Sequence, residues 1–490
     1  MTATGSTRKG TGDEPIHDRA GLAPPYGRRY AGTKMNSVQL YNTRTRAKET
    51  FVPADPSGNV RLFVCGPTVY ELPHLGHAKT YTQFDFIVRF LRARGYAVTY
   101  VQNITDVDDK IIRRARELGA ESSAVARRYE QAYLGDMSKL RNDSVDVYAR
   151  ASDYVEEVIS QVKRLQEAGA AYATPDGIYF DLTAFPDYGR LSGRLNVRRD
   201  DAVSRLDANP DKRNPGDFVL WKARRPGEPF WTSELGDGRP GWHIEDTAIT
   251  ERLLGTQYDL HGGAIDLIFP HHEAEIAQME TISGRRPMVA HWLHTGLLTT
   301  GDAKMSKSLG NFVAIRDALA TASVRAIRFA FFSSHYRSPM TLTDDTFSRA
   351  ARALDRLDRF VDGNDPEAGV GEPGPVRDAR TAIDAALDDD FDTPRALAAA
   401  FDLVRAQNRD GTHAQPARAL VAEFLATFAL DADASFVAPE IEINKSIEER
   451  ERLRRSGRFA EADRIRDRLR AQGIVLEDSR AGVRWRRSSR

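Results

Sequence analysis

The chain has 490 residues, too long for one ordinary domain, and its length predicts about three. Hydrophobic residues make up 41% and charged residues 29%, as in globular proteins, and 70 Lys and Arg balance 70 Asp and Glu, so any basic surface for a nucleic acid must be local. A single cysteine excludes an internal disulfide and a multi-cysteine zinc cluster, and it suits a reducing compartment.

The N-terminal segment is expected to lack structure. Residues 1–36 are rich in Gly, Pro and Thr with scattered charge, and they lack the apolar region of a secretory signal, so we expect a disordered extension. No apolar run approaches the roughly 18–20 residues that span a bilayer. We therefore expect a cytoplasmic protein with no membrane contact.

Residues 37–115 predict the first half of a catalytic sheet domain. Segment 61–66 is a short buried strand, 76–94 carries apolar residues at helical spacing, and 96–105 is a second strand rich in β-branched and aromatic residues. A strand, a helix and a strand in this order form a βαβ unit. The sheet is therefore expected to be parallel and of the Rossmann, nucleotide-binding type.

The rest of the sheet is expected after an insertion. Residues 116–235 are mostly helical, with a turn-rich hairpin at 173–185, and are interpreted as an inserted connective domain. Residues 236–312 return to the sheet, which we expect to resume in segments 241–250, 258–279 and 288–298.

The C-terminal part of the chain is expected to be helical. Residues 313–435 predict an α-helical bundle with a linker or surface loop at 363–376, and residues 436–490 predict a small unit of two helices and a hairpin. The expected fold class is α/β: a Rossmann-type parallel-sheet catalytic domain with an inserted domain, followed by an α-helical bundle and a small C-terminal unit.

Two short motifs point to phosphate chemistry. HLGH places His74 and His77 where the first strand meets a helix N-terminus, whose free N–H groups favour phosphate, although two capping or surface histidines would look the same. AKMSKSLGN places Lys304 and Lys307 on a loop, where lysines can meet a triphosphate and stabilise a leaving pyrophosphate. A solvated lysine-rich loop is the alternative. The two motifs together, in this order and separated by an insertion, are far more specific.

At these residues the sequence resembles the cysteinyl-tRNA synthetases, a family of class I aminoacyl-tRNA synthetases. HLGH is similar to the HIGH signature, and KMSKS is an intact class I signature. The segments that resemble this family specifically are CGPTVYELPHLGHAKT, VQNITDVDDKII, RPGWHIEDTAIT, DLHGGAIDLIFPHHEAEIAQ and AEADRIRDRLRAQGIVLEDSRAGVRWRR. The resemblance runs from about Asn36 to Arg490, and it implies that the C-terminal unit binds the anticodon.

The resemblance implies one zinc ion that binds the sulfur of the substrate cysteine. By motif match its protein ligands are Cys65, Asp246, His271 and Glu275. A thiol is readily deprotonated by a metal and gives a soft ligand, whereas the hydroxyl of serine does neither. The family usually has a second cysteine where this chain has Asp246, so we expect weaker zinc binding and a harder Lewis acid.

The resemblance also implies a reaction in two steps. Cysteine and ATP with Mg²⁺ give cysteinyl-adenylate, which is then transferred to tRNA(Cys). His74 and His77 would contact the ATP phosphates, and Lys304 and Lys307 would close over the triphosphate. The residues implied around the amino acid are Gly66, Thr105, Trp242 and Asp266, the last as partner of the ammonium group. Those implied around the adenosine are His261, Gly262 and Gly263.

Other residues allow two interpretations. His243 and His272 fit either a layer behind the metal ligands or a buried core. Arg484, Trp485 and Arg486 in VRWRR predict tRNA contact, because an aromatic ring beside arginines suits unpaired anticodon bases. The charges of EERERLRR fit a solvated helix equally well.

Several functions remain open at the level of sequence. Besides a cysteine–tRNA ligase, the chain suits a paralogue with an altered amino acid or acceptor, such as a ligase that passes cysteinyl-adenylate to a small amine. A catalytically inactive tRNA-binding protein is a further alternative, and so is an enzyme without zinc. The near-complete helical and C-terminal regions disfavour the small amine, and intact HLGH and KMSKS disfavour the inactive protein. We expect a monomer.

Overall fold

The computed structural model describes most of the chain. The described residues are 37–194, 209–301, 303–304, 312–363, 373–411, 413–431, 440–456, 458–471, 474–479 and 482–487. The expected extension 1–36, most of the KMSKS loop with Lys307, and most of the linker expected at 363–376 lie outside these residues.

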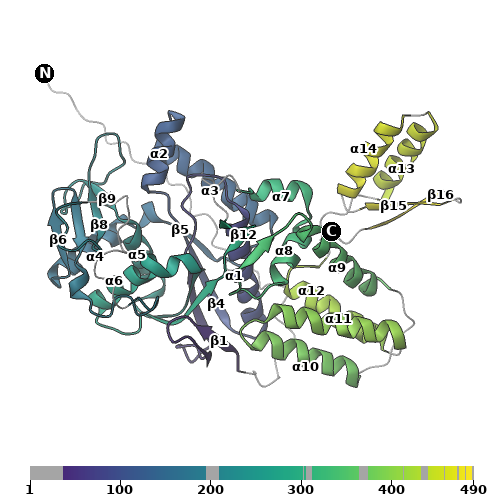
Figure 1. Cartoon of the computed structure of the whole chain (residues 1–490), viewed down its shortest axis with the longest axis horizontal. Helices are drawn as coiled ribbons and strands as arrows, with labels where there is room; N and C mark the ends of the chain where they lie inside the picture. Colours follow the sequence, from purple (N-terminus) through teal and green to yellow (C-terminus); the bar gives the residue numbers. More distant parts are fainter. Residues whose placement is uncertain are drawn as a thin grey trace.

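A five-stranded parallel sheet forms the centre of the catalytic unit (Figure 1). Its strand order is β11–β10–β3–β4–β5, and every neighbouring pair is parallel. The strands are β3 (Asn59–Val64), β4 (Ala97–Ile104), β5 (Val147–Arg150), β10 (Tyr258–Ala264) and β11 (Val289–Thr295). The expected parallel, nucleotide-binding sheet is therefore confirmed.

The order of strands changes direction between β3 and β10. From β3 the chain builds the sheet towards β4 and β5, and it returns to add β10 and β11 on the other side of β3. In open parallel sheets, ligands bind beyond the carboxyl ends of the strands at such a switch point. The residues that follow β3 and β10 are therefore the first place to look for a site.

Helix α1 (Leu75–Ala93) crosses over between β3 and β4. Most of its side chains are buried, because it lies between the sheet and α8 (Val324–Phe332). Its N-cap is His74, and the chain leaves it through Gly95, whose φ of 91° suits glycine. Because α1 is buried on nearly every side, its polar residues are buried too, and Lys79, Gln83 and Asp85 form hydrogen bonds there.

The inserted unit contains an antiparallel sheet of order β6–β7–β8–β9. Its strands are β6 (Ala171–Thr174), β7 (Gly177–Phe180), β8 (Phe218–Ala223) and β9 (Gly238–Pro240). The helices packed with it or beside it are α4 (Val155–Glu167), α5 (Trp242–Leu254) and α6 (Glu273–Ser283). The hairpin expected at 173–185 corresponds to β6 and β7.

Two expectations for this region are wrong. Segment 241–250 was expected to be a strand, but it forms α5; the helix is buried on several sides, so its Ile and Thr residues show no clean helical period. Strand β5 lies inside the range 116–235 expected for the insertion, yet it pairs with β4 in the central sheet. Its four residues, VYAR, are too few and too mixed to signal a strand.

The remaining short elements surround the sheet. They are β1 (Gln39–Asn42), β2 (Ala47–Thr50), α2 (Asp109–Leu118), α3 (Ser122–Lys139), β12 (Leu298–Thr300), β13 (Ala303–Lys304), α7 (Ile315–Thr321) and β14 (Met340–Leu342). Strand β12 pairs with both β13 and β14. The chain thus enters the KMSKS segment from a small sheet next to α1.

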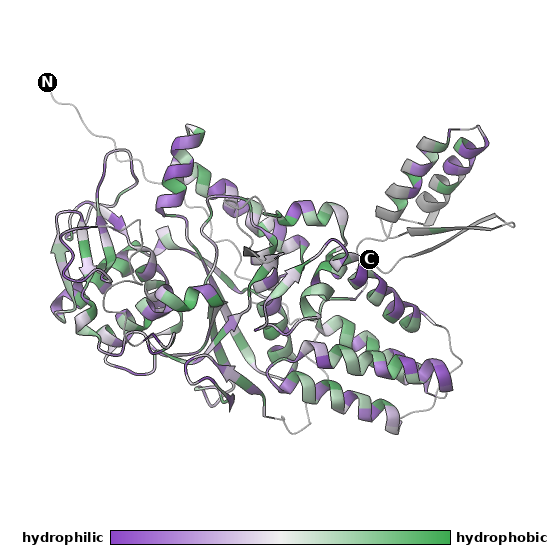
Figure 2. Cartoon of the chain, in the orientation of Figure 1, coloured by the Kyte–Doolittle hydropathy of each residue, from purple (hydrophilic) through white to green (hydrophobic). Residues whose placement is uncertain are grey.

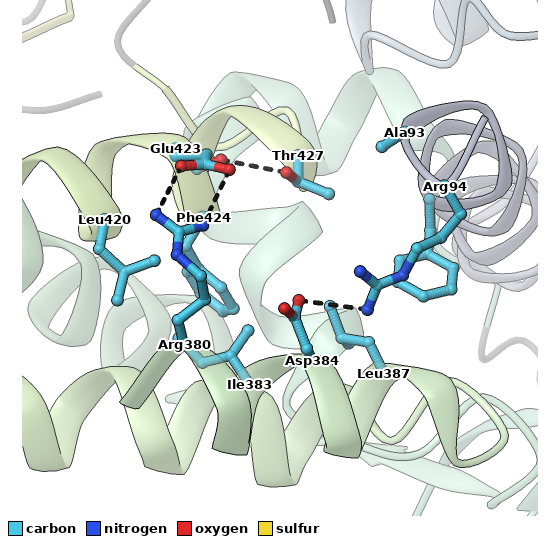
Figure 3. Close-up of a pocket in the computed structure, with 11 residues that line it drawn as sticks. Ala93, Arg94, Arg380, Ile383, Asp384, Leu387, Leu420, Glu423, Phe424 and Thr427 are labelled. Atoms are coloured by element: carbon cyan, nitrogen blue, oxygen red, sulfur yellow. Dashed lines mark hydrogen bonds and ion pairs between the residues drawn. The ribbon is translucent and has the colours of Figure 1, made fainter. Parts of the chain in front are cut away.

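Helices α9 (Thr346–Val361), α10 (Gly374–Asp388), α11 (Thr393–Asp410) and α12 (Ala414–Thr427) form the expected bundle. Their buried residues belong to one hydrophobic core with α1 and the sheet, and hydrophobic stretches run along α11 and α12 in Figure 2. At the junction, Arg94 reaches Asp384 of α10, while Arg380 pairs with Glu423 of α12 across a small hollow (Figure 3). The bundle and the catalytic sheet are therefore packed as one body.

The C-terminal unit has a small core of its own. It comprises α13 (Glu440–Arg455), α14 (Phe459–Ala471), β15 (Ile474–Ser479) and β16 (Gly482–Arg487), and the two strands pair antiparallel. Its core consists of Leu453, Ala462, Ile465 and Leu469. Throughout the described part of the chain, no helix is both long and apolar enough to cross a membrane.

Candidate active site and metal centre

Cys65 is the first residue after β3, at the switch point of the sheet. Its N–H donates to the carbonyl of Gly262 on β10 at 3.0 Å, and the Tyr81 hydroxyl donates to its carbonyl at 3.2 Å. The backbone of Cys65 is thus tied to β10 and to α1. Its Sγ lies 3.7 Å from Oε1 of Glu275, at the start of α6.

The structure brings together the four residues that the sequence predicted as metal ligands. Nε2 of His271 lies 2.9 Å from Oδ2 of Asp246 and 3.0 Å from Oε1 of Glu275. With Cys65, these residues offer four ligand atoms that all lie within 4.8 Å of one another. They come from the end of β3, from α5 and from the start of α6, so only the folded chain assembles them.

The electrostatics of this cluster favour a bound cation. Burial raises the pKa of the Cys65 thiol well above its usual range, and the nearby Glu275 and Asp246 raise it further. Burial, with a contribution from Asp246, likewise raises the pKa of the Glu275 carboxyl. Among the described residues, the ion-pair partners of these two carboxylates are histidines. A divalent cation would offset the negative charge and deprotonate the thiol, so the residues fit a metal ion.

Two further histidines lie against the same thiol. Nε2 of His261 is 3.4 Å and Nε2 of His272 is 3.2 Å from Sγ of Cys65. Both rings are fully buried, and burial holds both imidazole pKa values well below the usual range. They are therefore neutral, as metal ligands must be. Cys65, His261, His272 and Glu275 form a second group of ligand atoms within 4.8 Å of one another.

These positions resolve or revise three expectations. His272 contacts Cys65 directly, whereas His243 lies behind His271, with their Nδ1 atoms 2.8 Å apart. His261 was expected beside the adenosine, but its ring lies in the Cys65 cluster and stacks on Trp292 at 4.3 Å. Successive residues of a strand face opposite sides of the sheet. His261 and the next residue of β10, Gly262, therefore have different surroundings, although both were expected beside the adenosine.

Trp242, Gly66 and Thr105 surround the cluster. The Trp242 ring stacks on His271, with centroids 4.1 Å apart and planes 14° apart. A Cβ on Gly66 would lie 1.7 Å from the carbonyl oxygen of Asn103, so no larger residue fits there. Asn103 was missed by the sequence reasoning: it accepts from the N–H of Gly66 and donates to Oδ1 of Asp246 at 2.6 Å and to the Thr105 hydroxyl at 3.3 Å. Its partners Asp246 and Gly66 come from other segments, so no local pattern in the sequence indicated these contacts.

The HLGH histidines cap α1. The N–H of His77 donates to Nδ1 of His74 at 3.3 Å, the reverse bond closes a capping box, and the rings stack at 3.8 Å. His74 also forms an isolated bridge with Ala314, just after the KMSKS segment. The chain that follows the KMSKS segment therefore meets the N-terminal end of α1. Lys304 lies on β13 opposite Thr299, and Lys307 lies outside the described residues.

The remaining predicted residues are explained in part by packing. A Cβ on Gly262 would lie 2.3 Å from the Phe84 ring, and one on Gly263 would lie 3.0 Å from Leu267. Asp266 is exposed on the 3₁₀ turn Ile265–Leu267 that follows β10. In the C-terminal hairpin, Arg484, Trp485 and Arg486 lie on β16 opposite Glu477, Leu476 and Val475. Their roles towards substrates stay predictions.

The parallel sheet, the capped HLGH helix beside the KMSKS segment and the ligand cluster at the switch point define a class I aminoacyl-tRNA synthetase. Family models match along the chain as the "tRNA synthetases class I (C) catalytic domain" at residues 51–352, the "DALR domain" at 382–430 and the "Cysteinyl-tRNA ligase anticodon binding domain" at 441–486. The chain therefore belongs to the cysteinyl-tRNA ligase family.

Proteins of known name agree with this placement. The chain is 44% identical over 467 residues to the cysteine–tRNA ligase of Alkalilimnicola ehrlichii, and the match covers 92% of this chain and 100% of that protein. It is 45% identical over 466 residues to that of Halorhodospira halophila, with the same coverage. It is 41% identical over 479 residues to that of Thermococcus gammatolerans, covering 92% of this chain and 99% of that protein.

Solved structures agree on the fold alone. Mycobacterium tuberculosis methionyl-tRNA synthetase bound by methionyl-adenylate matches with a TM-score of 0.54 and 17% identity, over 76% of this chain and 90% of that one. The LeuRS of Agrobacterium radiobacter K84, in a ternary complex with tRNA, matches with a TM-score of 0.56 and 12% identity, over 77% of this chain and 84% of that one.

Proposed function

We propose that the protein is a cysteine–tRNA ligase that activates cysteine with ATP and transfers it to tRNA(Cys). The observation that carries the proposal is the buried group of Cys65, Asp246, His271 and Glu275 at the switch point of a class I sheet. Full-length similarity to cysteine–tRNA ligases supports it. A pocket that recognises cysteine needs a group that distinguishes a thiol from a hydroxyl, and a metal cluster suits that need.

We propose zinc as the ion, with the four residues of that group as its ligands. Once bound there, zinc would supply a borderline-soft Lewis acid that favours the substrate thiolate over the hydroxyl of serine. The surrounding residues support the ligands. Asn103 donates a hydrogen bond to Asp246. Trp242 stacks on the face of the His271 ring, and His243 contacts Nδ1 of that ring. Such outer contacts orient ligands and tune their basicity.

We propose that ATP binds where the two motifs meet. The first turn of α1 offers the positive end of a helix dipole, and His74 and His77 stand at that end. Lys304 and Lys307 would approach the triphosphate with Mg²⁺ and offset the charge of the leaving pyrophosphate. Gly66 and Thr105 would line the amino acid, and the exposed Asp266 would meet its ammonium group.

We propose tRNA(Cys) rather than a small amine as the acceptor. The bundle and the C-terminal unit, which match DALR and anticodon-binding families, support a long nucleic-acid partner, because a small amine needs no such reach. Arg484, Trp485 and Arg486 would contact unpaired anticodon bases. On this division, residues 37–312 form the catalytic domain with an insertion that follows β5, 313–435 the bundle and 436–490 the anticodon unit. We further propose a monomer acting in the cytoplasm.

The test is to measure three quantities on one preparation of the full chain: bound zinc, pyrophosphate exchange with cysteine or serine, and aminoacylation of tRNA(Cys). We expect about one zinc per chain, exchange with cysteine alone, and charging of tRNA(Cys). Exchange without charging would indicate the small-amine ligase. Binding of tRNA without exchange would indicate the inactive protein. Cysteine-specific charging by a zinc-free enzyme would contradict the metal assignment.

A further inference from the structure

Two sets of ligand atoms share the thiol of Cys65 and the carboxylate of Glu275. We call Cys65, Asp246, His271 and Glu275 the aspartate group, and Cys65, His261, His272 and Glu275 the histidine group. Because Cys65 and Glu275 belong to both, the two groups are alternative ligand sets for one ion. A single ion must occupy one or the other.

We propose that the histidine group is a second zinc position, which is occupied before the substrate cysteine binds. The aspartate group is then the position used when the substrate thiolate is present. This inference rests on the proposed function, because it takes the ion to be zinc. It goes beyond that function by assigning His261 and His272 as direct ligands and by giving the protein two metal positions.

The separations within the histidine group match those around a tetrahedral ion. Bonds of about 2.3 Å to sulfur and about 2.0 Å to nitrogen or oxygen place neighbouring ligand atoms about 3.3 to 3.5 Å apart. Sγ of Cys65 lies 3.4 Å from Nε2 of His261 and 3.2 Å from Nε2 of His272, and Nε2 of His261 lies 3.3 Å from Oε2 of Glu275. These three separations therefore lie within a few tenths of an ångström of those around one bound ion.

The aspartate group is drawn more tightly together. Its His271 lies 2.9 Å from Asp246 and 3.0 Å from Glu275, which are hydrogen-bond separations rather than ligand separations. An ion there requires these side chains to move apart by a few tenths of an ångström. The structure is therefore closer to the geometry in which the histidine group is occupied.

The other ring nitrogens of the histidine group are held by partners. Nδ1 of His261 lies 2.7 Å from the hydroxyl of Tyr258, and Nδ1 of His272 lies 2.8 Å from Nε2 of His294. His294 is itself held by the hydroxyl of Thr43 at 2.7 Å. Histidine ligands of metals regularly bind a hydrogen-bond partner through the second nitrogen. Both Nε2 atoms are thereby directed towards Cys65.

Glu275 independently indicates that the cluster suits a cation. Its Oε2 is fully buried and has no hydrogen-bond donor among the described residues. A buried carboxylate oxygen without a donor is costly, and a metal ion would satisfy it. That oxygen is the one nearest His261, so the unsatisfied atom belongs to the histidine group.

The histidine group supplies one thiolate and one carboxylate, which together balance the two charges of zinc. Every ligand residue is at most 4% exposed, so a matched ligand charge matters there. Four protein ligands close the histidine group, however, and leave no place for a substrate thiolate.

The decisive measurement is X-ray absorption at the zinc edge on the full-length, zinc-loaded protein, with and without cysteine. Without cysteine, we expect one sulfur and two imidazole ligands; with saturating cysteine, two sulfurs and one imidazole. One imidazole in the absence of cysteine overturns the inference and leaves the proposed function intact. Failure to bind zinc under any condition instead contradicts the zinc assignment of the proposed function.

Two substitutions separate the groups. Asp246→Asn removes the charge of the side chain but keeps its volume. We expect this variant to retain about one zinc with two imidazole ligands, and we expect added cysteine no longer to change the ligands of the zinc. His272→Gln is expected to retain zinc with one imidazole even without cysteine. His413→Gln, in the bundle, is the matched control and should leave both spectra unchanged. Loss of zinc in the folded Asp246→Asn protein would overturn the inference.

If the His272 variant fails to fold, as judged by circular dichroism, His261→Asn takes its place with the same expected loss of one imidazole. The wild-type spectra decide the inference without either variant.

Discussion

Cys65 shows how a single residue acquires its chemistry from its position. It follows β3 at the point where the strand order reverses, and its thiol is surrounded by carboxylates and neutral imidazoles. These carboxylates and burial raise its thiol pKa, which opposes the thiolate that a nucleophile needs. The surroundings of Cys65 are therefore those of a metal ligand.

Cys65→Ala tests this role directly. Because Cys65 belongs to both ligand groups, we expect zinc to fall well below one per chain and exchange of pyrophosphate with cysteine to be lost. The change in the free energy of unfolding of the metal-free protein should be modest, about 1 kcal/mol. Metal analysis, exchange kinetics and urea unfolding check these points. Full zinc content with wild-type exchange would contradict the metal role.

Asp246 is the residue at which this chain departs from its family. With the substrate cysteine bound, when we infer that the aspartate group holds the ion, we expect Asp246→Cys to strengthen zinc binding by at least about tenfold, or about 1.4 kcal/mol, because thiolate is the softer ligand. Competition with a chromogenic chelator measures the affinity, and Asp246→Asn serves as the matched variant without a charged ligand. Unchanged or weaker binding in the cysteine variant would show that Asp246 does not take part in holding the ion.

Lys79 offers a prediction on pH. Its Nζ is buried and donates to the carbonyls of Gly296 at 2.7 Å and Tyr336 at 3.3 Å, and burial lowers its pKa to about 8. Between pH 8 and 10.5 the unfolded chain still binds a proton that the folded chain has lost. The stability of the wild type relative to Lys79→Met should therefore rise with pH across this window, by up to about 3 kcal/mol.

Urea unfolding of the wild type and Lys79→Met at half-unit steps from pH 7 to 10 measures that difference. Other titrating groups are common to both proteins and largely cancel. Below pH 8 both states of the wild type hold the proton, so the difference should be flat there. A difference that stays flat or falls above pH 8 would rule out a lowered lysine pKa.

At the scale of elements, α1 connects the chemistry to the bundle. It follows its N-cap His74 in the HLGH motif and ends beside Arg94, which is 9% exposed. Nη2 of Arg94 lies 3.1 Å from Asp384 of α10 (Figure 3). It also lies 2.9 Å from Asp388 of the same helix. A helix packed on nearly every side is rigid, so α10 and the HLGH motif are held in one geometry.

Arg94→Met tests how strongly this contact holds the two units together. Removing one partner leaves buried carboxylates without their cation, which costs about 3 kcal/mol of the free energy of unfolding. The exposed ion pair of Lys48 with Asp389 is the matched control, and Lys48→Met should change stability by less than about 1 kcal/mol. Equal effects in urea unfolding would show that burial of the Arg94 contact is unimportant.

At the scale of the whole molecule, two cores have different extents. The main core joins the sheet, α1 and the bundle up to Leu430, whereas Leu453, Ala462, Ile465 and Leu469 form a separate one. A chain shortened after Asp431 loses none of the main core. The catalytic unit is therefore expected to fold without the C-terminal unit.

The shortened chain should retain cysteine-dependent pyrophosphate exchange within about twofold, while kcat/KM for tRNA(Cys) falls by at least about 100-fold, or about 2.7 kcal/mol. The full chain with Arg484 and Arg486 both changed to Ala should lose charging in part and keep exchange. Loss of exchange on shortening would show that the C-terminal unit supports the catalytic site.

Local pattern was sufficient for much of the fold and failed where burial removes periodicity. The β3–α1–β4 unit and the C-terminal hairpin were predicted because each has a clear period or turn signal. Helix α5 was mistaken for a strand because it is buried on several sides, and β5 was missed because four mixed residues carry no pattern. The contacts of Asn103 and His261 had no local signal, because their partners come from distant segments.

The sequence by itself determined the class of fold and the family, because motifs and strand–helix periods are properties of neighbouring residues. Through the resemblance to that family it also named Cys65, Asp246, His271 and Glu275 as the expected metal ligands. Only the tertiary structure decided that His261 and His272 share the thiol with them and that α1 joins the nucleotide motif to the bundle. Both depend on the order of strands in the sheet, which brings residue 65 against residues 261–275. Contacts across about 200 positions are set by packing, and no local pattern records them.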